Sequence, residues 1–402
     1  MSAVGYEAVR IDDVGREGDG IARILGETVF VPFTLKGDEV EIDRDGNRGT
    51  LITVLKPGPD RVVPPCPYFG QCGGCALQHM SGDSTRAYKH KLVTEALDIA
   101  GISVEVAPVI EAFGAGRRRA TLHVAKGAAG YMQARSHDVL DIDACPILVP
   151  ALRTAAPRIA RALYAVAGEC TASFTATDTG LDLAVKSGRK LKPTLLADFA
   201  RLHQVARLTF NGEAIYMART PVMKMGRAMV EPPPASFLQA TAVAEDALAR
   251  LVLEGLGPVK SVVDLFSGMG PFALRLAEGA RVLAVDNDRP ATDALLKAMR
   301  HVQGLKPITV LVRDLFRDPL APVELEKFEA AVFDPPRAGA EAQALEMARS
   351  SLKTIVAVSC EPKSFARDAA ILLAGGYRLE SVTPVDQFQF SAHVELVAVF
   401  RK

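Results

Sequence analysis

The C-terminal part of the chain alternates short apolar runs with longer amphipathic stretches, and this alternation restricts the fold more than any other feature. The runs are rich in Val, Ile, Leu and Ala and have the length of buried strands. They occupy Ser261–Phe266, Arg281–Val285, Ile308–Val312, Ala330–Phe333 and Thr354–Ser359. Strands that alternate with helices form a parallel sheet, which binds ligands at the carboxyl ends of its strands. We therefore predict a Rossmann-like α/β unit with its site just after these runs.

Two proline-rich stretches, Lys56–Pro67 and Glu231–Pro234, separate this unit from two others. The first residues contain short strand-like runs between turns rich in Gly and Asp, a pattern typical of a small OB-like β-barrel. The middle residues contain one helical candidate, Thr85–Ala100, followed by irregular and β-like segments, which indicates a β-rich α+β unit. We expect three units, at residues 1–58, 59–235 and 236–402.

The first apolar run leads into a loop, Asp264-Leu-Phe-Ser-Gly-Met-Gly, with the glycine spacing of nucleotide-binding turns. Gly268 and Gly270 allow a tight turn and close approach of the backbone to a ligand. The second run leads to Asp286, whose carboxylate can accept hydrogen bonds from ribose hydroxyls. The spacing Gly268-x-Gly270-x-x-Ala273 fits both NAD and S-adenosylmethionine. Asp264 favours S-adenosylmethionine, because its carboxylate is placed for a cationic methionine group.

Reactive side chains follow the later runs. Asp334-Pro-Pro-Arg follows the fourth run, Cys360 follows the fifth, and His393-Val-Glu395 begins a final apolar strand. A thiol and a carboxylate near a methyl donor suit methylation of uracil at C5. Addition of a thiolate to C6 makes C5 nucleophilic, and a base then removes the C5 proton so that elimination frees the enzyme. The alternatives are that Cys360 is a buried thiol and that Glu395 is a surface salt-bridge residue.

These motifs resemble those of the RNA 5-methyluridine methyltransferase family, and the resemblance covers nearly the whole chain. It is carried by Asp264-Leu-Phe-Ser-Gly-Met-Gly, Asp334-Pro-Pro-Arg-Ala-Gly, Ser359-Cys-Glu-Pro and His393-Val-Glu. It implies that Cys360 is the nucleophile and Glu395 the base. The positions that match family contacts to S-adenosylmethionine are Gln239, Phe266, Gly268 and Asp286. Asp314 and Asp334 match positions that line the adenine and the uracil side of the cleft.

Two positions depart from the family pattern. Glu361 stands where the family usually has Asn, and Gln389 stands where it usually has Pro after a Phe. A carboxylate beside the nucleophile is expected to raise the pKa of Cys360 unless Lys363 offsets it. The reaction type is therefore better supported than the fit of the target base.

The N-terminal unit resembles the TRAM domain, a barrel module of RNA-modifying enzymes. The resemblance is carried by Gly18-Asp-Gly-Ile-Ala-Arg, Thr28-Val-Phe-Val-Pro-Phe and Gly37-Asp-Glu-Val. The whole chain thus resembles a Rossmann-like S-adenosylmethionine methyltransferase domain, preceded by a TRAM barrel and a central domain. This combination favours 23S rRNA as the target, although some relatives with a barrel modify tRNA.

Four cysteines form a candidate cofactor site. The spacing Cys66-x5-Cys72-Gly-Gly-Cys75, with Cys145 downstream, is typical of a four-thiolate site. Zinc and an iron–sulfur cluster both accept four thiolates. A structural zinc ribbon more often has two Cys-x2-Cys pairs, and this chain has one. Members of the family that carry a cluster show this pattern, so the resemblance favours a structural [4Fe-4S] cluster, with zinc as the alternative.

Charge is segregated along the chain although the formal sum is zero, with 47 Lys and Arg against 47 Asp and Glu. Residues 1–60 contain 7 basic and 12 acidic residues, whereas residues 61–235 contain 21 and 14. The middle excess includes three clusters, which are Arg86, Lys89 and Lys91, the run Arg117-Arg118-Arg119, and Lys186, Arg189, Lys190 and Lys192. Clustered cations around the four cysteines indicate an RNA-binding surface. We therefore expect RNA as the partner.

Other classes of protein are less consistent with the sequence. An NAD-linked oxidoreductase leaves the barrel, the four cysteines and Glu395 without a role. A non-catalytic RNA-binding protein leaves Cys360 without one. Cytosine C5 methylation is disfavoured because no second cysteine lies near Asp334-Pro-Pro. No apolar run reaches the roughly 18 residues that a membrane span needs, so we expect no membrane contact. We also expect the protein to be cytoplasmic and monomeric.

Overall fold

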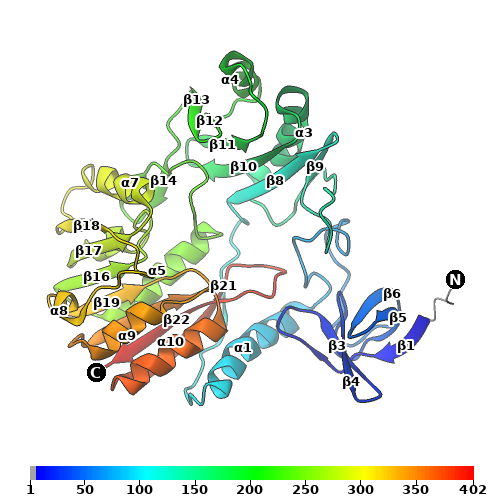
Figure 1. Ribbon diagram of the computed structural model, residues 1–402, viewed down its shortest axis with the longest axis horizontal. Coiled ribbons are helices and arrows are strands. Elements are labelled where there is room, and N and C mark those ends of the chain that lie inside the picture. The colour runs from blue at the N-terminus through cyan, green and yellow to red at the C-terminus, as the bar shows by residue number, and fades with distance from the viewer. Residues whose placement is uncertain (1–5) are drawn as a thin grey trace.

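The structure is a computed structural model that describes residues 6–402. Figure 1 shows three bodies, with the N-terminal strands at the lower right, a middle sheet at the top and the C-terminal α/β body at the lower left. In residues 6–402 there is no helix with the length and apolar character needed to cross a membrane.

The N-terminal body is a six-stranded sheet in the order β1-β5-β6-β4-β3-β2. Its strands are β1 (Tyr6–Arg10), β2 (Asp13–Val14), β3 (Gly20–Ile24), β4 (Glu27–Val31), β5 (Glu39–Asp45) and β6 (Arg48–Lys56). Side chains alternate between the two faces of a strand, and one face supplies the small core. That core contains Ile11, Ala22, Val29, Val31, Val40 and Ile42. The sequence pattern indicated several short strands in this unit, and the shortest of the six is the two-residue β2.

The middle body is a second six-stranded sheet in the order β13-β12-β11-β10-β8-β9. Its strands are β8 (Arg119–Ala125), β9 (Ala128–Gly130), β10 (Cys170–Thr177), β11 (Gly180–Lys186), β12 (Arg207–Phe210) and β13 (Glu213–Met217). The helices that accompany it are α2 (Pro150–Arg153), α3 (Ala155–Ala167) and α4 (Pro193–Leu202). A short hairpin, β14 (Met223–Met225) and β15 (Ala228–Val230), leads to the next body.

The expectation of only irregular and β-like segments after the first helix was wrong for α3 and α4. In α3 the buried residues Ala156, Ile159, Ala160 and Leu163 recur at helical spacing and pack into the core of the middle sheet. That periodicity was therefore available in the sequence.

The C-terminal body is an eight-stranded sheet in the order β18-β17-β16-β19-β20-β22-β21-β7. The five expected strands are confirmed to within one residue as β16 (Ser261–Leu265), β17 (Arg281–Asp286), β18 (Ile308–Val312), β19 (Ala330–Phe333) and β20 (Thr354–Ser359). They are parallel. The remaining strands are β22 (Glu395–Arg401), β21 (Arg378–Asp386) and β7 (Ile110–Glu111). β22 is antiparallel to both β20 and β21.

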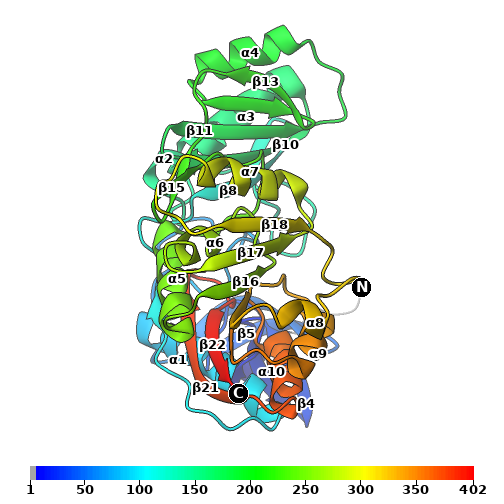
Figure 2. The ribbon, with the colours of Figure 1, turned by 90° about the vertical axis from the view of Figure 1, so that its left-hand side faces the viewer.

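Helices cover both faces of this sheet, as the Rossmann-like prediction requires (Figure 2). One face packs against α5 (Ala242–Leu256), α6 (Ala273–Leu276) and α7 (Arg289–Met299). The other face packs against α1 (Gly82–Ile99), α8 (Pro322–Leu325), α9 (Glu341–Arg349) and α10 (Pro362–Ala374). α1 precedes the middle body in the chain, yet Val93 and Leu97 belong to the core of the C-terminal sheet, and Figure 1 shows α1 beside α10.

Buried ion pairs connect segments that are distant in sequence. Lys89 of α1 is fully buried and pairs with Asp386 at the end of β21. Arg118, just before β8, pairs with Glu245 of α5, which also pairs with Arg275 at 3.1 Å. Removal of one member of such a pair leaves an uncompensated buried charge. These contacts therefore fix the middle segments against the C-terminal body.

Candidate active site

Strand register brings the candidate catalytic residues to one edge of the C-terminal sheet. Leu265 pairs with Phe333, Phe333 pairs with Ala357, and Ser359 pairs with Leu396. The glycine loop, Asp334 and Cys360 each follow the carboxyl end of one of these strands. Glu395 is the first residue of the antiparallel β22 and so lies at the same edge. The prediction that these strand ends open onto one place therefore agrees with the register.

The glycine loop is closed by Asp286. The Gly268 N–H donates to one carboxylate oxygen of Asp286 at 2.8 Å, and the Asp288 N–H donates to the other at 2.8 Å. Each oxygen keeps a second lone pair for a ligand hydroxyl. Gly270 has φ +84°, and a Cβ there would lie 2.5 Å from Cδ1 of the buried Leu295. Only glycine fits this turn without displacing α7.

Asp264 is fully buried within β16. Neither of its carboxyl oxygens has a hydrogen-bond partner among the described residues. Burial, and then the nearby charge of Asp334, raise the pKa of Asp264 well above its ordinary value. A buried carboxyl group without a partner beneath a ligand loop is consistent with a ligand cation nearby.

Aromatic side chains lie beside the loop on the side of β18. Phe266 has φ +63°, and its ring centroid lies 5.5 Å from that of Phe316. Asp314 accepts a hydrogen bond from the Phe316 N–H at 3.0 Å and thereby fixes the turn after β18. Phe316 is 44% exposed and was not identified from the sequence. Its position two residues after Asp314 was the available signal.

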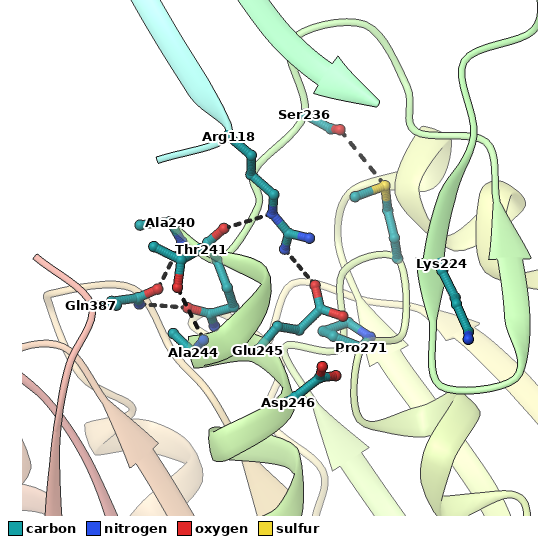
Figure 3. A network of polar contacts seen from close by, with 12 residues as sticks. Arg118, Lys224, Ser236, Ala240, Thr241, Ala244, Glu245, Asp246, Pro271 and Gln387 are labelled. Atoms are coloured by element: carbon teal, nitrogen blue, oxygen red, sulfur yellow. Dashed lines mark hydrogen bonds and ion pairs between the residues drawn. The ribbon is translucent and has the colours of Figure 1, made fainter. Parts of the chain in front are cut away.

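A chain of side-chain amides connects the two buried carboxyl groups of the site. Gln239 donates to Asp334 at 3.1 Å, and Gln387 donates to Gln239 at 2.7 Å and to Glu395 at 3.0 Å. The Ala240 N–H donates to Gln387 at 2.7 Å, as Figure 3 shows. Gln387 was missed by sequence reasoning, because its partners lie 8 and 148 residues away.

Arg118, from the middle body, contacts the hydrogen-bonded series formed by Gln239 and Gln387. Its Nε donates to the Gln239 carbonyl at 3.1 Å, while its terminal nitrogen pairs with Glu245. Figure 3 shows Arg118 reaching from the end of the segment before β8 toward α5. The backbone of Gln239 is therefore fixed by a residue from another body.

Burial is the largest influence on the pKa values of Cys360, Glu395 and Asp334. It raises the pKa of Cys360 to about 12, with further increases from Glu395 and Asp334 and a decrease from Arg337. It raises the pKa of Glu395 to about 8 and that of Asp334 to about 7. At neutral pH the Cys360 thiol is therefore protonated, and the carboxyl groups of Glu395 and Asp334 are protonated in part.

Glu361 has a different role from the one expected. It is the N-cap of α10, where its carboxylate accepts a hydrogen bond from the Lys363 N–H at 3.3 Å. The largest influences on the pKa of Cys360 are burial, Glu395 and Asp334 rather than Glu361. Glu361 therefore caps the helix terminus, a role that Asn also fills.

The four predicted cofactor ligands line one cavity. Cys66, Cys72, Cys75 and Cys145 surround it together with aromatic residues and Arg117. Burial raises the pKa of Cys72 and Cys75, and it raises that of Cys145 to about 11. In residues 6–402 no group of three or more His, Cys, Asp or Glu side chains is arranged so that it could hold a metal ion. Four thiol groups around one cavity are the right ligands for a four-thiolate cofactor, but the distances between them are not those of a formed metal site.

The cysteine segment contacts the loop that precedes Glu395. The N–H groups of Ala76 and Leu77 both donate to the Phe390 carbonyl, at 2.9 and 3.0 Å. Arg117, which lines the cysteine cavity, lies 5.8 Å from the centroid of the Phe388 ring. The segment around the cysteines therefore helps to position the loop of Phe388 and Phe390.

The expected basic surface is only partly available to a ligand. Arg118 and Lys89 are buried in ion pairs, and Lys91 pairs with Asp13 at 2.8 Å. Arg117 and Arg119 form no ion pair with the described residues, and the Nε of each is buried without a hydrogen-bond partner. These two arginines are the members of the run that are not committed to an ion pair among the described residues.

Comparisons with known proteins agree with this arrangement. The family model for tRNA (uracil-5-)-methyltransferase matches residues 225–402, and that for the TRAM domain matches residues 6–43. An uncharacterized RNA methyltransferase from Brucella suis is 46% identical over 98% of this chain and 97% of its own length. The 23S rRNA (uracil(1939)-C(5))-methyltransferase RlmD from Dichelobacter nodosus is 32% identical over 99% of both chains.

A solved structure has the same fold over the full length. The crystal structure of the Pyrococcus abyssi tRNA (uracil-54, C5)-methyltransferase in complex with S-adenosyl-L-homocysteine superposes with a TM-score of 0.79. It covers 100% of both chains at 23% sequence identity. The full-length relatives are RNA methyltransferases, and they argue against the NAD-linked oxidoreductase that the glycine spacing left open. The chain belongs to the RNA (uracil-5-)-methyltransferase family, with a TRAM domain at residues 6–43.

Proposed function

We propose that the protein methylates C5 of a uridine in 23S rRNA with S-adenosylmethionine as methyl donor, through a covalent adduct between Cys360 and C6. The observation that carries this proposal is the convergence of Cys360, Glu395 and Asp334 at one strand edge beside the glycine loop. Ribosomal RNA is favoured over tRNA because RlmD, a 23S rRNA enzyme, is similar over the full length at 32% identity.

The methyl donor is assigned to the loop side of this edge. S-adenosylmethionine supplies an electrophilic methyl group when it is bound. The carboxylate of Asp286 accepts hydrogen bonds from the ribose hydroxyls of the donor. Phe266 and Asp314 lie on the side of the cleft assigned to its adenine ring. The residues assigned to hold the donor are Gln239, Asp264, Phe266, Gly268, Gly270, Asp286 and Asp314.

Cys360 and Glu395 act in sequence on the uracil ring. A Cys360 thiolate adds to C6, and the ring then carries nucleophilic character at C5. Arg337 favours the thiolate because its charge lowers the pKa of Cys360. Asp334 lies on the uracil side. After methylation, Glu395 accepts the C5 proton, and a base with a pKa near 8 is suited to accept and release protons near neutral pH.

The barrel and the middle body are assigned to RNA binding. TRAM domains occur on RNA-modifying enzymes, and Arg117 and Arg119 leave two guanidinium groups unpaired among the described residues. Residues 1–58 and 59–235 then hold the RNA while residues 236–402 carry the chemistry. α1 and β7 are the exception, since they pack with the C-terminal sheet.

The four cysteines are proposed to hold a structural [4Fe-4S] cluster. Four thiols around one cavity match the ligand set of such a cluster. Its role is to fix the cysteine segment against Phe390 and Arg117, because methyl transfer needs no electron transfer. Anaerobic purification should give a brown protein with about four iron and four sulfide per chain. Stoichiometric zinc without iron would contradict this assignment.

The activity is tested by nucleoside mapping of ribosomal and transfer RNA from a strain that lacks the gene. One 5-methyluridine of 23S rRNA should disappear and should return with the wild-type gene. Cys360→Ala should fail to restore it, whereas Cys170→Ala should restore it, because Cys170 is a buried thiol in β10 away from the site. Retention of every 5-methyluridine in 23S rRNA refutes the rRNA target, and loss of one from tRNA assigns the tRNA target instead.

A further inference from the structure

Gln387 lies in the loop after β21 and is 2% exposed. We propose that Gln387 is a positioning residue that selects which oxygen of Glu395 accepts the C5 proton and connects this base to the methyl-donor side through Gln239. The inference rests on the proposed function and adds a residue to it.

One backbone N–H group fixes the direction of the hydrogen bonds made by the Gln387 and Gln239 amides. The Ala240 N–H can only donate, so the Gln387 atom 2.7 Å away must be the amide oxygen. The Gln387 nitrogen then donates to both Gln239 and Glu395. Gln239 accepts with its oxygen and therefore donates to Asp334 with its nitrogen. Both amides are thus fixed in one orientation.

This arrangement distinguishes the two oxygens of Glu395. Oε1 accepts the hydrogen bond from Gln387 at 3.0 Å. Oε2 is buried and has no hydrogen-bond partner among the described residues. A buried carboxyl oxygen without a partner is costly to maintain unless a ligand uses it. Oε2 is therefore the oxygen available to the substrate.

The proton transfer balances with this oxygen as the acceptor. The C5–H bond breaks and its proton binds to Oε2. The electron pair of that bond forms the C5–C6 double bond, and the C6–S bond breaks so that its pair returns to Cys360. The donor from Gln387 stabilises the carboxylate before the transfer. It also keeps the group from rotating Oε1 into the place of Oε2.

Several charged groups besides Gln387 face Glu395. Asp334 follows β19 and raises the pKa of Glu395, while Arg337 in the same loop lowers it. Cys360 follows β20, and Glu395 raises its pKa. The bond from Gln387 lowers the pKa of Glu395. Loss of that bond should therefore move the ionisation of Glu395 to higher pH.

Two variants separate this role from packing. Gln387→Leu removes all three hydrogen bonds. Gln387→Glu keeps the shape and an acceptor for the Ala240 N–H but replaces the donating NH2 group with oxygen. Gln343→Leu is the matched control, because Gln343 is a fully buried glutamine of α9 whose amide bonds only the backbone of Leu320.

The experiment uses the full-length protein and 23S rRNA from the strain that lacks the gene. Both Gln387 variants should release 5-methyluridine product 10- to 100-fold more slowly, while the covalent protein–RNA adduct accumulates on denaturing gels. The rising limb of the release rate against pH should move to higher pH. Gln343→Leu should retain the wild-type limb.

The outcomes are distinguishable. Wild-type release and an unchanged pH limb in both Gln387 variants overturn the positioning role. A reduced rate without adduct accumulation or a pH shift also overturns it, because that is the result of a packing defect. If Gln387→Leu does not fold, Gln387→Glu decides. If the wild-type protein forms neither adduct nor product, the proposed function itself fails and the inference fails with it.

Discussion

Cys360 has a strongly raised pKa, and this opposes the nucleophilic role that we propose for it. Burial is the main cause of the raised pKa, and the negative charges of Glu395 and Asp334 add to it. The thiolate fraction of the free protein is therefore small at neutral pH. The reactivity of the thiol then depends on the charges near its sulfur. The charge of Glu395 can be removed with little change in side-chain volume by the substitution Glu395→Gln.

Glu395→Gln should increase alkylation of Cys360 by iodoacetamide although it abolishes methylation. Glu395 has a pKa of about 8, so its charge acts on Cys360 mainly above that pH. The variant should react several-fold faster at pH 9 and only slightly faster at pH 7. Site-resolved mass spectrometry measures this, with Cys170 as internal reference. Equal rates at pH 9 would contradict the electrostatic link between these residues.

Gly270→Ala should weaken binding of S-adenosylmethionine at least tenfold in calorimetry. Alanine disfavours φ +84°, and its Cβ would meet Leu295 at 2.5 Å. Gly279→Ala is the matched control, because a Cβ there has open space around it. Similar affinities for the two variants would show that the loop tolerates the strain.

Residue types at strand ends could be predicted from the sequence, but the contacts between them could not. Asp334, Cys360 and Glu395 were identified because each adjoins an apolar run or motif. Gln387 was missed because no local pattern marks it, whereas Phe316 was missed although it lies two residues after Asp314. The role of Gln387 depends on Ala240, which lies 147 residues away in the chain.

At the scale of elements, α1 links segments that are distant in the chain. Its Lys89 is fully buried and pairs with Asp386, and it donates to the Phe388 carbonyl at 2.9 Å. Val93 and Leu97 on the same helix pack into the core beneath the C-terminal sheet. α1 therefore secures the loop that precedes Glu395.

Lys89→Met should destabilise the protein by about 3–5 kcal/mol, because Asp386 would remain buried without its cation. Lys91→Met on the same helix should cost about 1 kcal/mol or less, since its pair with Asp13 is exposed. Urea unfolding followed by circular dichroism measures both. The double variant Lys89→Met, Asp386→Asn should recover part of the loss. Equal unfolding midpoints for the two single variants would contradict this account.

Elements with a strong local pattern were predicted well. Strands β16 to β20 are apolar runs flanked by polar residues, and their ends were predicted to within one residue. The packing of α1 on the C-terminal sheet and the addition of β7 to that sheet could not be predicted in this way. The position of β7 depends on pairing between Ile110 and Val385, and nothing near Ile110 in the sequence specifies that partner.

At the scale of the whole molecule, zero net charge limits non-specific attraction to RNA. Four of the candidate cations of the middle segment, Arg86, Lys89, Lys91 and Arg118, are used in internal ion pairs. Arg117 and Arg119 are not among them, and the cluster Lys186, Arg189, Lys190 and Lys192 is exposed. RNA affinity should therefore depend on local clusters of charge and fall less with salt than that of a uniformly basic protein.

Substitution of both Arg117 and Arg119 by Gln should weaken RNA binding and reduce the slope of log Kd against log salt by about 1.4, if each contacts one phosphate of a single strand. Arg250→Gln is the control, because Arg250 is exposed on α5 and pairs with Glu254 at 3.2 Å. Fluorescence anisotropy with a 23S rRNA fragment measures the slopes. An unchanged slope in the double variant would assign phosphate binding to other residues.

The pairing of α1 with the far end of the chain also bears on how the protein is made. Lys89 and Asp386 are separated by 297 residues. At a synthesis rate of roughly 5–20 residues per second, Asp386 is added about 15–60 s after Lys89. The face of α1 that packs against the C-terminal sheet is therefore synthesised well before the strands that bury it. Lys89 can form its buried ion pair only once Asp386 has been added to the chain.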